Sequence, residues 1–234
     1  MKVLLALSLA ATLAASLAVT TPPEEPRRVD APIAAPPSDA IVLFDGTSLD
    51  GWTTLDGSPA RWTLLPDLLA MRVERGAGNI VSRERFVDCQ LHLEFRTPLP
   101  PTGDGQDRGN SGVYLHGRYE VQVLDSWKAA TRPDGQCGAI YGTHPPLVNA
   151  SREPGAWQTY DIIFKAPRFD ARGIRTAPAT LTVLHNGVLI HDRAVVDSPT
   201  AAAGFSTEEP GPAGLMLQDH GCAVEYRTIW LRRL

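Results

Sequence analysis

The sequence predicts an all-β protein, a two-sheet antiparallel sandwich of the jelly-roll type. From Ile41 onward, short apolar or alternating runs are interrupted by Gly, Pro and Asp about every dozen residues, as in antiparallel strands joined by turns. Helical periodicity is absent outside the N-terminal segment. Because so many strands must share one core-sized domain, two packed sheets are the economical architecture, and a β-barrel is the alternative.

The candidate strands, in chain order, are IVLF, RWTLL, LAMRV, NIVSR, CQLHLEFR, SGVYLH, YEVQVLD, WQTYDIIFKAP, ATLTVLHNGVLIHDRAVV, AGLMLQDHG and VEYRTIWLRRL. Asn186-Gly187 predicts a hairpin turn, because both central residues of that turn need a positive φ. Residues 97–109 and 128–153 lack strand alternation and are predicted to be loops. Loops of this length in a compact domain are usually functional or disordered, and both border polar strands, so we expect a functional role.

The length and charge of the chain limit the classes of function that the protein can have. The chain has 234 residues, of which 43% are hydrophobic, enough for one medium-sized domain with a real core. Its formal net charge is -4 and its Lys and Arg residues are scattered, so it lacks the basic stripe that binds a nucleic-acid backbone. The sequence therefore excludes nucleic-acid binding and suits a neutral or cationic partner.

The N-terminus predicts export. Residues 1–19 carry one Lys, an apolar run and then small residues, the layout of a signal peptide cleaved between Ala15 and Ala18. A membrane anchor is the alternative, since the apolar stretch just reaches the length of a spanning helix. Residues 20–38 are dominated by Pro, Ala and charge and are predicted to be a linker, which leaves 39–234 as the domain. We expect a periplasmic or extracellular protein without stable membrane insertion after cleavage.

Three predicted strands carry polar side chains on one face and apolar side chains on the other. In LHLEFR the apolar face holds Leu91, Leu93 and Phe95, and the polar face holds His92, Glu94 and Arg96. In GRYEVQVLDS the apolar face holds Tyr119, Val121 and Val123, the polar face holds Glu120 and Gln122, and Asp125 and Ser126 lie at the strand end. In LMLQDHG the two faces hold Leu215 and Leu217, and Met216, Gln218 and His220. On adjoining strands of a curved sheet, the polar groups would converge on a groove.

A polar strand face is normally the solvated side of a sheet. These faces, however, combine Glu, Gln, His, Arg and Tyr, the side chains that bind sugar hydroxyls through hydrogen bonds and ring stacking. Gly109 and Gly112, on either side of Asn110-Ser111, indicate a bulge or a close approach of the backbone to a ligand. The residue choice therefore favours a saccharide-binding groove over a solvated face.

Several other chemistries are excluded. A retaining glycosidase needs two carboxylates at a set separation on one face, and Gln122 interrupts the series from Glu120 to Asp125. The sequence contains no G-x-S-x-G elbow, P-loop or H-E-x-x-H motif. The histidines without a carboxylate or imidazole at ligand spacing, which we interpret as solvated or core-edge residues, are His116, His144, His185 and His191. No metal site is predicted from these motifs.

The three cysteines are Cys89, Cys137 and Cys222, and their spacings match no zinc signature. Export would place these cysteines in an oxidising compartment, where disulfides form. Cys137 and Cys222 flank the predicted groove in sequence and are the expected pair if a disulfide forms. Buried free thiols are the alternative.

Over Ile41 to Leu234 the chain resembles the 3-keto-disaccharide hydrolase domain family, common in secreted bacterial proteins. The motifs that carry the resemblance are LFDGTSLDGW, LEFR, NSGVYLHGRYEVQVLDS, GAIYG, the W-x-x-Y of Trp157 to Tyr160, LHNGVLIHD and, most specifically, GLMLQDHGCAVEYRTIWLR. The resemblance implies a concanavalin-like jelly roll whose concave face binds saccharide. Trp52, Trp157 and the Asp45-Gly46 turn are interpreted as structural.

The resemblance also implies a substrate class, glycosides whose sugar is oxidised to a ketone at C3. Such a ketone acidifies the C2 proton, so one general base could remove it and leave an enediolate that expels the C1 substituent. Hydration then gives net hydrolysis. This chemistry needs a base, donors around the oxyanion and an acid for the leaving group, but not two carboxylates in glycosidase geometry. A lectin-like binding module is the alternative function, since the same side chains can hold sugar without reacting.

Carried onto this sequence, the resemblance makes His220, with Asp219 beside it, the leading candidate for the base. Glu120 is the alternative base, and Glu94 and Arg96 are expected to orient groups or stabilise the oxyanion. The expected substrate-binding residues are Arg96, Asn110, Gln122, Asp125, Tyr141 and Gln218, with Tyr141 as a stacking platform. No cofactor is required, although Glu94, Glu120 or His220 would permit a divalent cation.

Overall fold

A computed structural model describes residues 29–32 and 35–234. The predicted signal peptide, 1–19, and linker residues 20–28, 33 and 34 lie outside the described residues. In the part of the chain that is described, none of the helices has the length and apolar character needed to cross a membrane.

The larger sheet has eight strands in the order β13-β12-β9-β6-β15-β4-β3, with β1 paired to β15. All its pairings are antiparallel. The bounds of its strands are β1 Ile41–Phe44, β3 Thr63–Leu65, β4 Ala70–Arg72, β6 Cys89–Arg96, β9 Gln158–Lys165, β12 Ala179–His185, β13 Val188–Val196 and β15 Glu225–Arg233. Asn186 and Gly187, at φ 53 and 78, form the tight turn between β12 and β13, which confirms the predicted hairpin.

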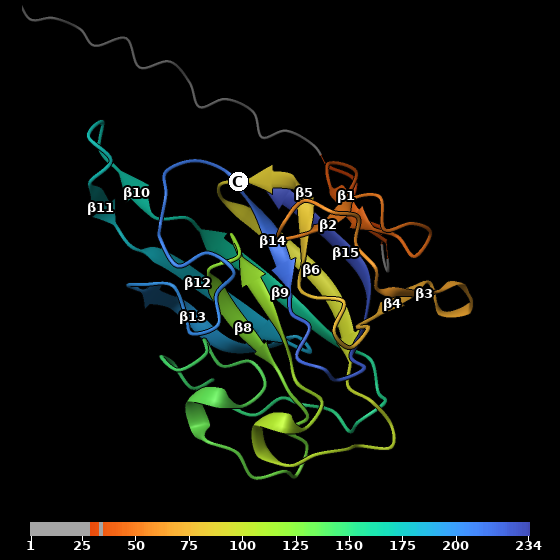
Figure 1. Cartoon of the computed structure of the whole chain (residues 1–234). Coiled ribbons are helices and arrows are strands. Elements are labelled where there is room, and N and C mark those ends of the chain that lie inside the picture. The colour runs from red at the N-terminus through yellow and green to blue at the C-terminus, as the bar shows by residue number, and fades with distance from the viewer. Residues whose placement is uncertain (1–28, 33–34) are drawn as a thin grey trace, which may run out of the picture.

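The second sheet has five strands in the order β2-β5-β14-β7-β8, also antiparallel. The bounds of its strands are β2 Trp52–Thr54, β5 Ile80–Phe86, β7 Ser111–Leu115, β8 Tyr119–Val123 and β14 Ala213–Leu217. A separate two-stranded sheet joins β10 Arg168–Phe169 and β11 Arg175–Ala177. Figure 1 shows the two main sheets facing each other as layers of a sandwich, which confirms the predicted all-β fold class.

Alternation along the strands builds the core between the sheets. On β6 the predicted apolar face, Leu91, Leu93 and Phe95, is fully buried. The side chains that the five-stranded sheet contributes to the same core include Val113, Leu115, Tyr119, Val121, Val123, Leu215 and Leu217. Because successive strand residues point to opposite faces, the intervening residues of β7, β8 and β14 must lie on the face turned away from the core. That face carries the candidate site.

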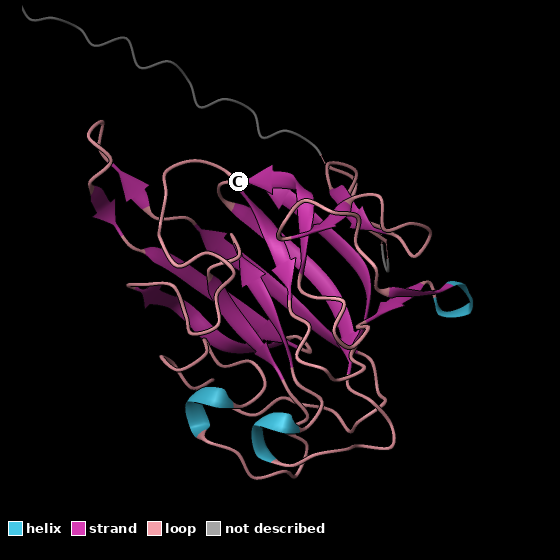
Figure 2. Cartoon of the chain, viewed as in Figure 1, coloured by secondary structure: helices cyan, strands magenta, loops and turns pink. Residues whose placement is uncertain are grey.

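The two predicted loops contain one short 3-10 helix each, η2 Gly105–Asp107 and η3 Pro133–Gly135, which lie at the same end of the molecule (Figure 2). The third, η1 Pro66–Leu68, lies between β3 and β4. Gln106 joins the two loops, since its Nε2 donates to Thr131 Oγ1 at 2.7 Å and to the Gly135 carbonyl at 2.8 Å. The loops that border the polar strands are therefore fastened to each other.

The expected Cys137–Cys222 disulfide is wrong, because all three cysteines are free thiols. Buried Cys137 has its Sγ 3.2 Å from the Tyr160 hydroxyl. Cys222 Sγ instead contacts the Asp107 carbonyl oxygen at 3.5 Å. The two residues flank the groove in sequence, but their side chains point into different surroundings.

Candidate functional site

A pocket of about 60 Å³ opens on the face of the five-stranded sheet that is turned away from the core. Its lining residues are Asn110, Glu120, Gln122, Tyr141, Ala202, Gln218 and His220. Six of these were predicted from the sequence as site residues. Two of them lie on β8 and the others lie in four connecting segments that are far apart in the chain, so only the folded sheet brings them together.

Register aligns these side chains. Tyr114 on β7 lies directly opposite Glu120 on β8, and Gly112 lies opposite Gln122. Gln218 follows β14, and its backbone N–H donates to the Gly112 carbonyl at 3.0 Å. Tyr114 with Glu120, and Gly112 with Gln122, therefore form two neighbouring cross-strand pairs beneath the pocket.

Glu120 is the carboxyl at the bottom of the pocket and is 2% exposed. Burial raises its pKa to about 8, because the charged form loses hydration, while a hydrogen bond with Tyr114 acts in the opposite direction. At neutral pH Glu120 is therefore mostly protonated. A buried carboxyl with a pKa near the working pH suits proton transfer.

Gly112 provides the room for this carboxyl. A Cβ at Gly112 would lie 2.4 Å from Glu120 Oε1 and 2.6 Å from Tyr114 Cε2, distances that real contacts do not reach. The sequence indicated a bulge or a close approach of the backbone to a ligand at this glycine. Its neighbours are instead two side chains of the site itself.

Three amides supply acceptors. Asn110, Gln122 and Gln218 are each more than nine-tenths buried. Their amide nitrogens donate to the Gln106 carbonyl at 2.6 Å, to Gln106 Oε1 at 3.2 Å and to the Tyr114 hydroxyl at 3.0 Å. Their amide oxygens have no hydrogen-bond partner among the described residues. Buried oxygens without a partner are rare, and in a pocket they suit the hydroxyl donors of a ligand.

Two residues of this network were not predicted. Tyr114 links Glu120 to Gln218, and Gln106 holds Asn110 and Gln122. Alternation in SGVYLH puts Tyr114 on the same face as Gly112, so a strict period-2 reading could have found it. Gln106 lies in a loop without periodicity and gave no such signal.

Tyr141 and His220 border the pocket. The Tyr141 backbone N–H donates to the Glu120 carbonyl at 3.3 Å, and the Arg132 guanidinium lies 4.7 Å from its ring centroid. His220 is exposed and follows the end of β14. Asp219 does not orient it: Asp219 Oδ2 accepts from the backbone N–H groups of Gly76 at 2.8 Å and Gly78 at 3.0 Å.

Glu94 and Arg96 lie elsewhere. Both are on β6 in the larger sheet, on its polar face as predicted, but not on the sheet that carries the pocket. Glu94 Oε2 is 2.7 Å from Arg227 Nη2, and Arg96 Nε is 2.5 Å from Glu225 Oε2. Glu94 and Arg96, which were expected to orient groups or stabilise the oxyanion, are therefore paired with Arg227 and Glu225 instead.

The ring of Trp157 packs against the same ion pairs. Its centroid lies 4.8 Å from the Arg96 guanidinium and 4.0 Å from that of Arg227. Trp52 is buried and donates from its ring nitrogen to the Leu43 carbonyl at 3.0 Å. Both tryptophans make structural contacts, as predicted from the sequence.

Asp125 is buried beside the pocket rather than in its lining. Its Oδ2 lies 2.8 Å from Arg108 Nε, and its Oδ1 accepts from the Trp127 N–H at 3.2 Å. This carboxylate holds the start of the loop that follows β8. A direct contact of Asp125 with a ligand in the pocket is therefore not supported.

Among residues 29–32 and 35–234, no three His, Cys, Asp or Glu side chains converge in a geometry that could hold a metal ion. Of the three side chains named as potential cation ligands, Glu120 and His220 share the pocket, and Glu94 does not.

A jelly-roll sandwich with a carboxyl, an imidazole and amides in a pocket on one sheet is typical of carbohydrate-active proteins. The family model of the 3-keto-alpha-glucoside-1,2-lyase-like domain matches residues 39–232. The chain therefore belongs to this family, the 3-keto-disaccharide hydrolase domain family that its motifs predicted. No protein of curated function matches the sequence.

Solved structures agree with this assignment. A "putative glycosyl hydrolase" from Parabacteroides distasonis is 40% identical, with 86% of each chain covered and a TM-score of 0.79. Two further proteins from that organism with the same name are 16% and 22% identical, with TM-scores of 0.62 and 0.55. They cover 84% and 83% of this chain and 94% and 99% of their own chains. The latter two similarities concern the fold alone.

Proposed function

We propose that the protein cleaves 3-keto-glycosides by removing the proton at C2 and eliminating the substituent at C1. The observation that carries this proposal is the buried Glu120 carboxyl, with its pKa raised by burial, in one pocket with His220 and three amide oxygens that lack partners. Family membership supports the substrate class. The second carboxylate of a retaining glycosidase is missing from the pocket lining, which favours elimination over direct displacement at C1.

In this mechanism the neutral imidazole of His220 takes the C2 proton, and the electron pair forms the C2–C3 double bond of an enolate. The enolate then reforms the C3 ketone as the C1–oxygen bond breaks, which leaves a C1–C2 double bond. Protonated Glu120 gives its proton to the departing oxygen. A pair of groups with different environments can in this way divide the roles of base and acid.

Hydration completes the reaction. Glu120, now a carboxylate stabilised by its hydrogen bond from Tyr114, takes a proton from water as the oxygen attacks C1. The protonated His220 returns its proton to C2, so both groups regain their starting state. If the unsaturated sugar leaves first, the same residues perform a lyase reaction.

The amide oxygens of Asn110, Gln122 and Gln218 orient the sugar in this proposal. Each accepts a hydroxyl of the substrate, which satisfies an acceptor that is otherwise buried without a partner. The ring of Tyr141 provides an apolar surface beside Glu120. Such contacts increase the reaction rate because they hold the C2 proton close to the base.

The test compares a 3-keto-glycoside with the same glycoside unoxidised. We expect release of the aglycone only from the keto form, and slower release when C2 carries deuterium. Equal cleavage of both forms would exclude elimination. Binding of either sugar without release would instead indicate a carbohydrate-binding module, for which the three amide oxygens are equally suited.

We further propose that the protein acts outside the cytoplasm after removal of its N-terminal segment. The layout of residues 1–19 supports this proposal. Intact-mass measurement of the protein from its native host tests it, and a cytosolic product that retains Met1 would exclude it.

A further inference from the structure

A second pocket, of about 400 Å³, lies on the same face of the five-stranded sheet. Its charged lining residues are Arg83, Arg85, Arg118 and Glu209. Three arginines and one glutamate give this pocket a net charge of +2, although the whole chain carries -4. The pocket is therefore positively charged, whereas the protein as a whole is negatively charged.

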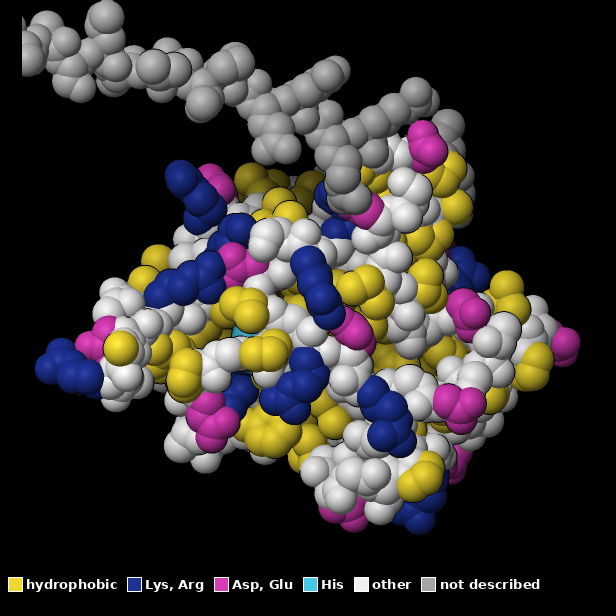
Figure 3. All heavy atoms as spheres, turned by 90° about the horizontal axis from the view of Figure 1, so that it is seen from above, with side chains coloured by type: hydrophobic (Ala, Val, Ile, Leu, Met, Phe, Trp, Pro, Cys, Tyr) yellow, Lys and Arg dark blue, Asp and Glu magenta, His cyan; other side chains and the backbone are white. Residues whose placement is uncertain are grey.

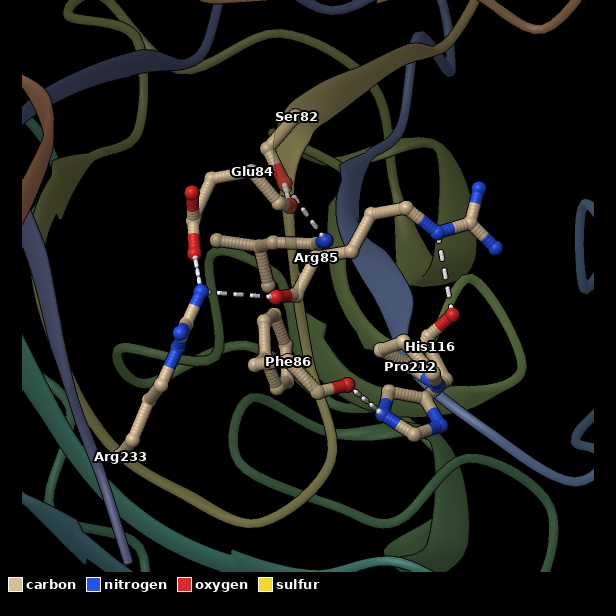
Figure 4. Close-up of polar contacts among 8 residues, drawn as sticks. Ser82, Glu84, Arg85, Phe86, His116, Pro212 and Arg233 are labelled. Atoms are coloured by element: carbon tan, nitrogen blue, oxygen red, sulfur yellow. Dashed lines mark hydrogen bonds and ion pairs between the residues drawn. The ribbon is translucent and has the colours of Figure 1, made fainter.

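Arg83 and Arg85 are two residues apart on β5, and both line this pocket. Each is held through Nε by a backbone carbonyl, of Asp50 at 2.9 Å and of Pro212 at 3.0 Å. Neither forms an ion pair with any residue that the structure describes. In Figure 4 the two terminal nitrogens of Arg85 point away from its neighbours. A guanidinium that is oriented by Nε but has both terminal nitrogens free suits bidentate binding of an oxyanion.

Arg118 is the buried member of the set, with a side chain 8% exposed. Its Nη1 donates to the His116 carbonyl at 3.0 Å, and its guanidinium lies 5.3 Å from the Phe205 ring centroid. Its carboxylate neighbour is Glu209, 3.7 Å from Nη2 and 73% exposed. An exposed carboxylate at that distance compensates a buried cation only weakly. The pocket therefore retains positive charge that is not fully compensated.

Figure 3, which views the molecule from above relative to Figure 1, shows Lys and Arg side chains interspersed with hydrophobic and acidic ones. A continuous basic surface, suited to a polyanion, is absent from this view. Three arginines gathered in one pocket of about 400 Å³ are suited to a single anionic group rather than to a charged polymer backbone.

The two pockets are neighbours. Met216 pairs with Val81 of β5 and with Tyr114 of β7, and Tyr114 pairs with Glu120 of β8. Arg83 and Arg85 lie two and four residues beyond Val81, so their backbones are about 16 to 20 Å from that of Glu120. The segment from Ala202 to Phe205 lies between them, with Ala202 lining the Glu120 pocket and Phe205 lining the arginine pocket. Arg118, which also lines the arginine pocket, comes two residues before Glu120, so a unit that leaves from Glu120 enters the arginine pocket on its Arg118 side.

We infer that the pocket of Arg83, Arg85 and Arg118 binds a carboxylate or sulfate on the unit that leaves when the glycosidic bond is cleaved. This inference rests on the proposed function. The substrate class is then a 3-keto-disaccharide whose second unit is acidic. Phe205 supplies the apolar wall for that unit, and the arginines select its charge.

The experiment uses three 3-keto-disaccharides that differ only in the second unit, which is glucuronic acid, glucose 6-sulfate or the neutral glucuronamide. We expect kcat/KM to be about 10- to 100-fold higher for the acidic units, the factor of one charge-assisted hydrogen bond. Whichever acid gains more identifies the preferred oxyanion. The preference should decrease as salt is added, because Arg83 and Arg85 are exposed.

The variant Arg83→Gln/Arg85→Gln should reduce the ratio of kcat/KM for the acidic substrates to kcat/KM for the neutral substrate to near one. It should leave kcat/KM for the neutral substrate unchanged. Arg118 is not substituted, because its burial makes loss of fold the expected result. Arg193→Gln, on β13 of the larger sheet with its side chain 84% exposed, is the matched control and should keep the ratio. An equal kcat/KM for all three substrates in the unmodified protein would overturn the inference and leave the proposed function intact.

A binding arm keeps the inference testable if the proposed function fails. Absence of turnover with every keto substrate would refute that function, and calorimetry with free glucuronate and glucuronamide then decides the inference. We expect tighter binding of glucuronate, and loss of the difference in Arg83→Gln/Arg85→Gln. Equal affinities in the unmodified protein would overturn it.

Discussion

Tyr114 and Glu120 face each other across β7 and β8 as a registered pair, and their side chains are hydrogen-bonded to each other in the interior of the protein. The Tyr114 hydroxyl also accepts from Gln218 Nε2 at 3.0 Å. One phenol thus connects the proposed acid to a proposed sugar-binding amide. Burial and the neighbouring Glu120 raise the pKa of Tyr114, so the phenol stays protonated throughout the working range.

This pair gives the first prediction. Glu120→Gln keeps the shape but removes the proton donor, so turnover of a 3-keto-glycoside should fall by about 10²–10⁴-fold. In the unmodified protein, activity should decrease as pH rises through about 8, since burial raises the pKa of Glu120 to about 8 and the acid is lost above it. Tyr114→Phe should move that limb to higher pH, because the hydrogen bond from Tyr114 lowers the pKa of Glu120. If activity falls at the same pH in Tyr114→Phe as in the unmodified protein, the hydrogen bond from Tyr114 does not lower the pKa of Glu120.

The second prediction concerns stability. The pKa of Glu120 is raised from 4.5 to about 8, so between these values the folded state binds more protons than the unfolded state. The contribution is therefore fully present below about pH 4.5 and is lost as pH rises through 8, at a slope of at most about 1.4 kcal/mol per pH unit. Glu120→Gln lacks this slope and should gain a few kcal/mol relative to the unmodified protein between pH 5 and 8.

Urea unfolding of both proteins at pH 5 and pH 8 measures this difference. The comparison with the variant is needed because buried His116 and His185, with pKa values lowered to about 4 by desolvation, add a contribution of opposite sign. That contribution is common to both proteins and cancels. Parallel stability profiles would show that Glu120 ionises in the folded state as it does in the unfolded chain.

The third prediction tests the space beneath the carboxyl. Gly112→Ala should reduce kcat strongly while the protein still folds, because the new Cβ would displace the side chains of Glu120 and Tyr114 rather than backbone atoms. Gly51→Ala is the matched control, since its Cβ would meet only the Leu43 carbonyl at 3.4 Å. Circular dichroism and steady-state kinetics of both variants provide the measurement. Full activity in Gly112→Ala would mean that the position of Glu120 is not critical.

A fourth prediction separates the base from the binding groups. His220→Ala should lower kcat by about 10²–10⁴-fold, whereas Gln218→Ala should mainly raise KM by removing one amide acceptor. Asp219→Asn should affect thermal stability more than kcat, because Asp219 binds the Gly76 and Gly78 backbone instead of the imidazole. Full turnover in His220→Ala would transfer the role of the base to Glu120.

The fifth prediction concerns the thiols. Cys222, which is partly exposed, should react with a thiol reagent in the folded protein, while Cys89 and Cys137 should react only after unfolding. Burial raises the pKa values of both buried thiols, so little reactive thiolate is present. Counting thiols before and after denaturation tests this. A protein with fewer than three thiols after denaturation without reductant would restore the disulfide interpretation.

Strand alternation allowed much of the site to be predicted. Glu120 and Gln122 were placed on a polar face because Tyr119, Val121 and Val123 had to be in the core, and the structure agrees. The same reasoning identified the polar face of Glu94 and Arg96 correctly. It could not show that this face belongs to the other sheet, because alternation fixes a side within one strand and says nothing about which strands pair.

The fold class, the hairpin at Asn186-Gly187 and the polar or apolar face of each strand could be predicted without the structure, because these follow from local periodicity and backbone preference. That Asn110, Glu120, Gln218 and His220 share one pocket could not be predicted in this way, since contacts between distant segments depend on sheet order and register. The same holds for the burial that raises the pKa of Glu120 and for the surroundings that keep Cys137 and Cys222 apart. Desolvation and partner choice depend on everything that packs around a group, and no local pattern records them.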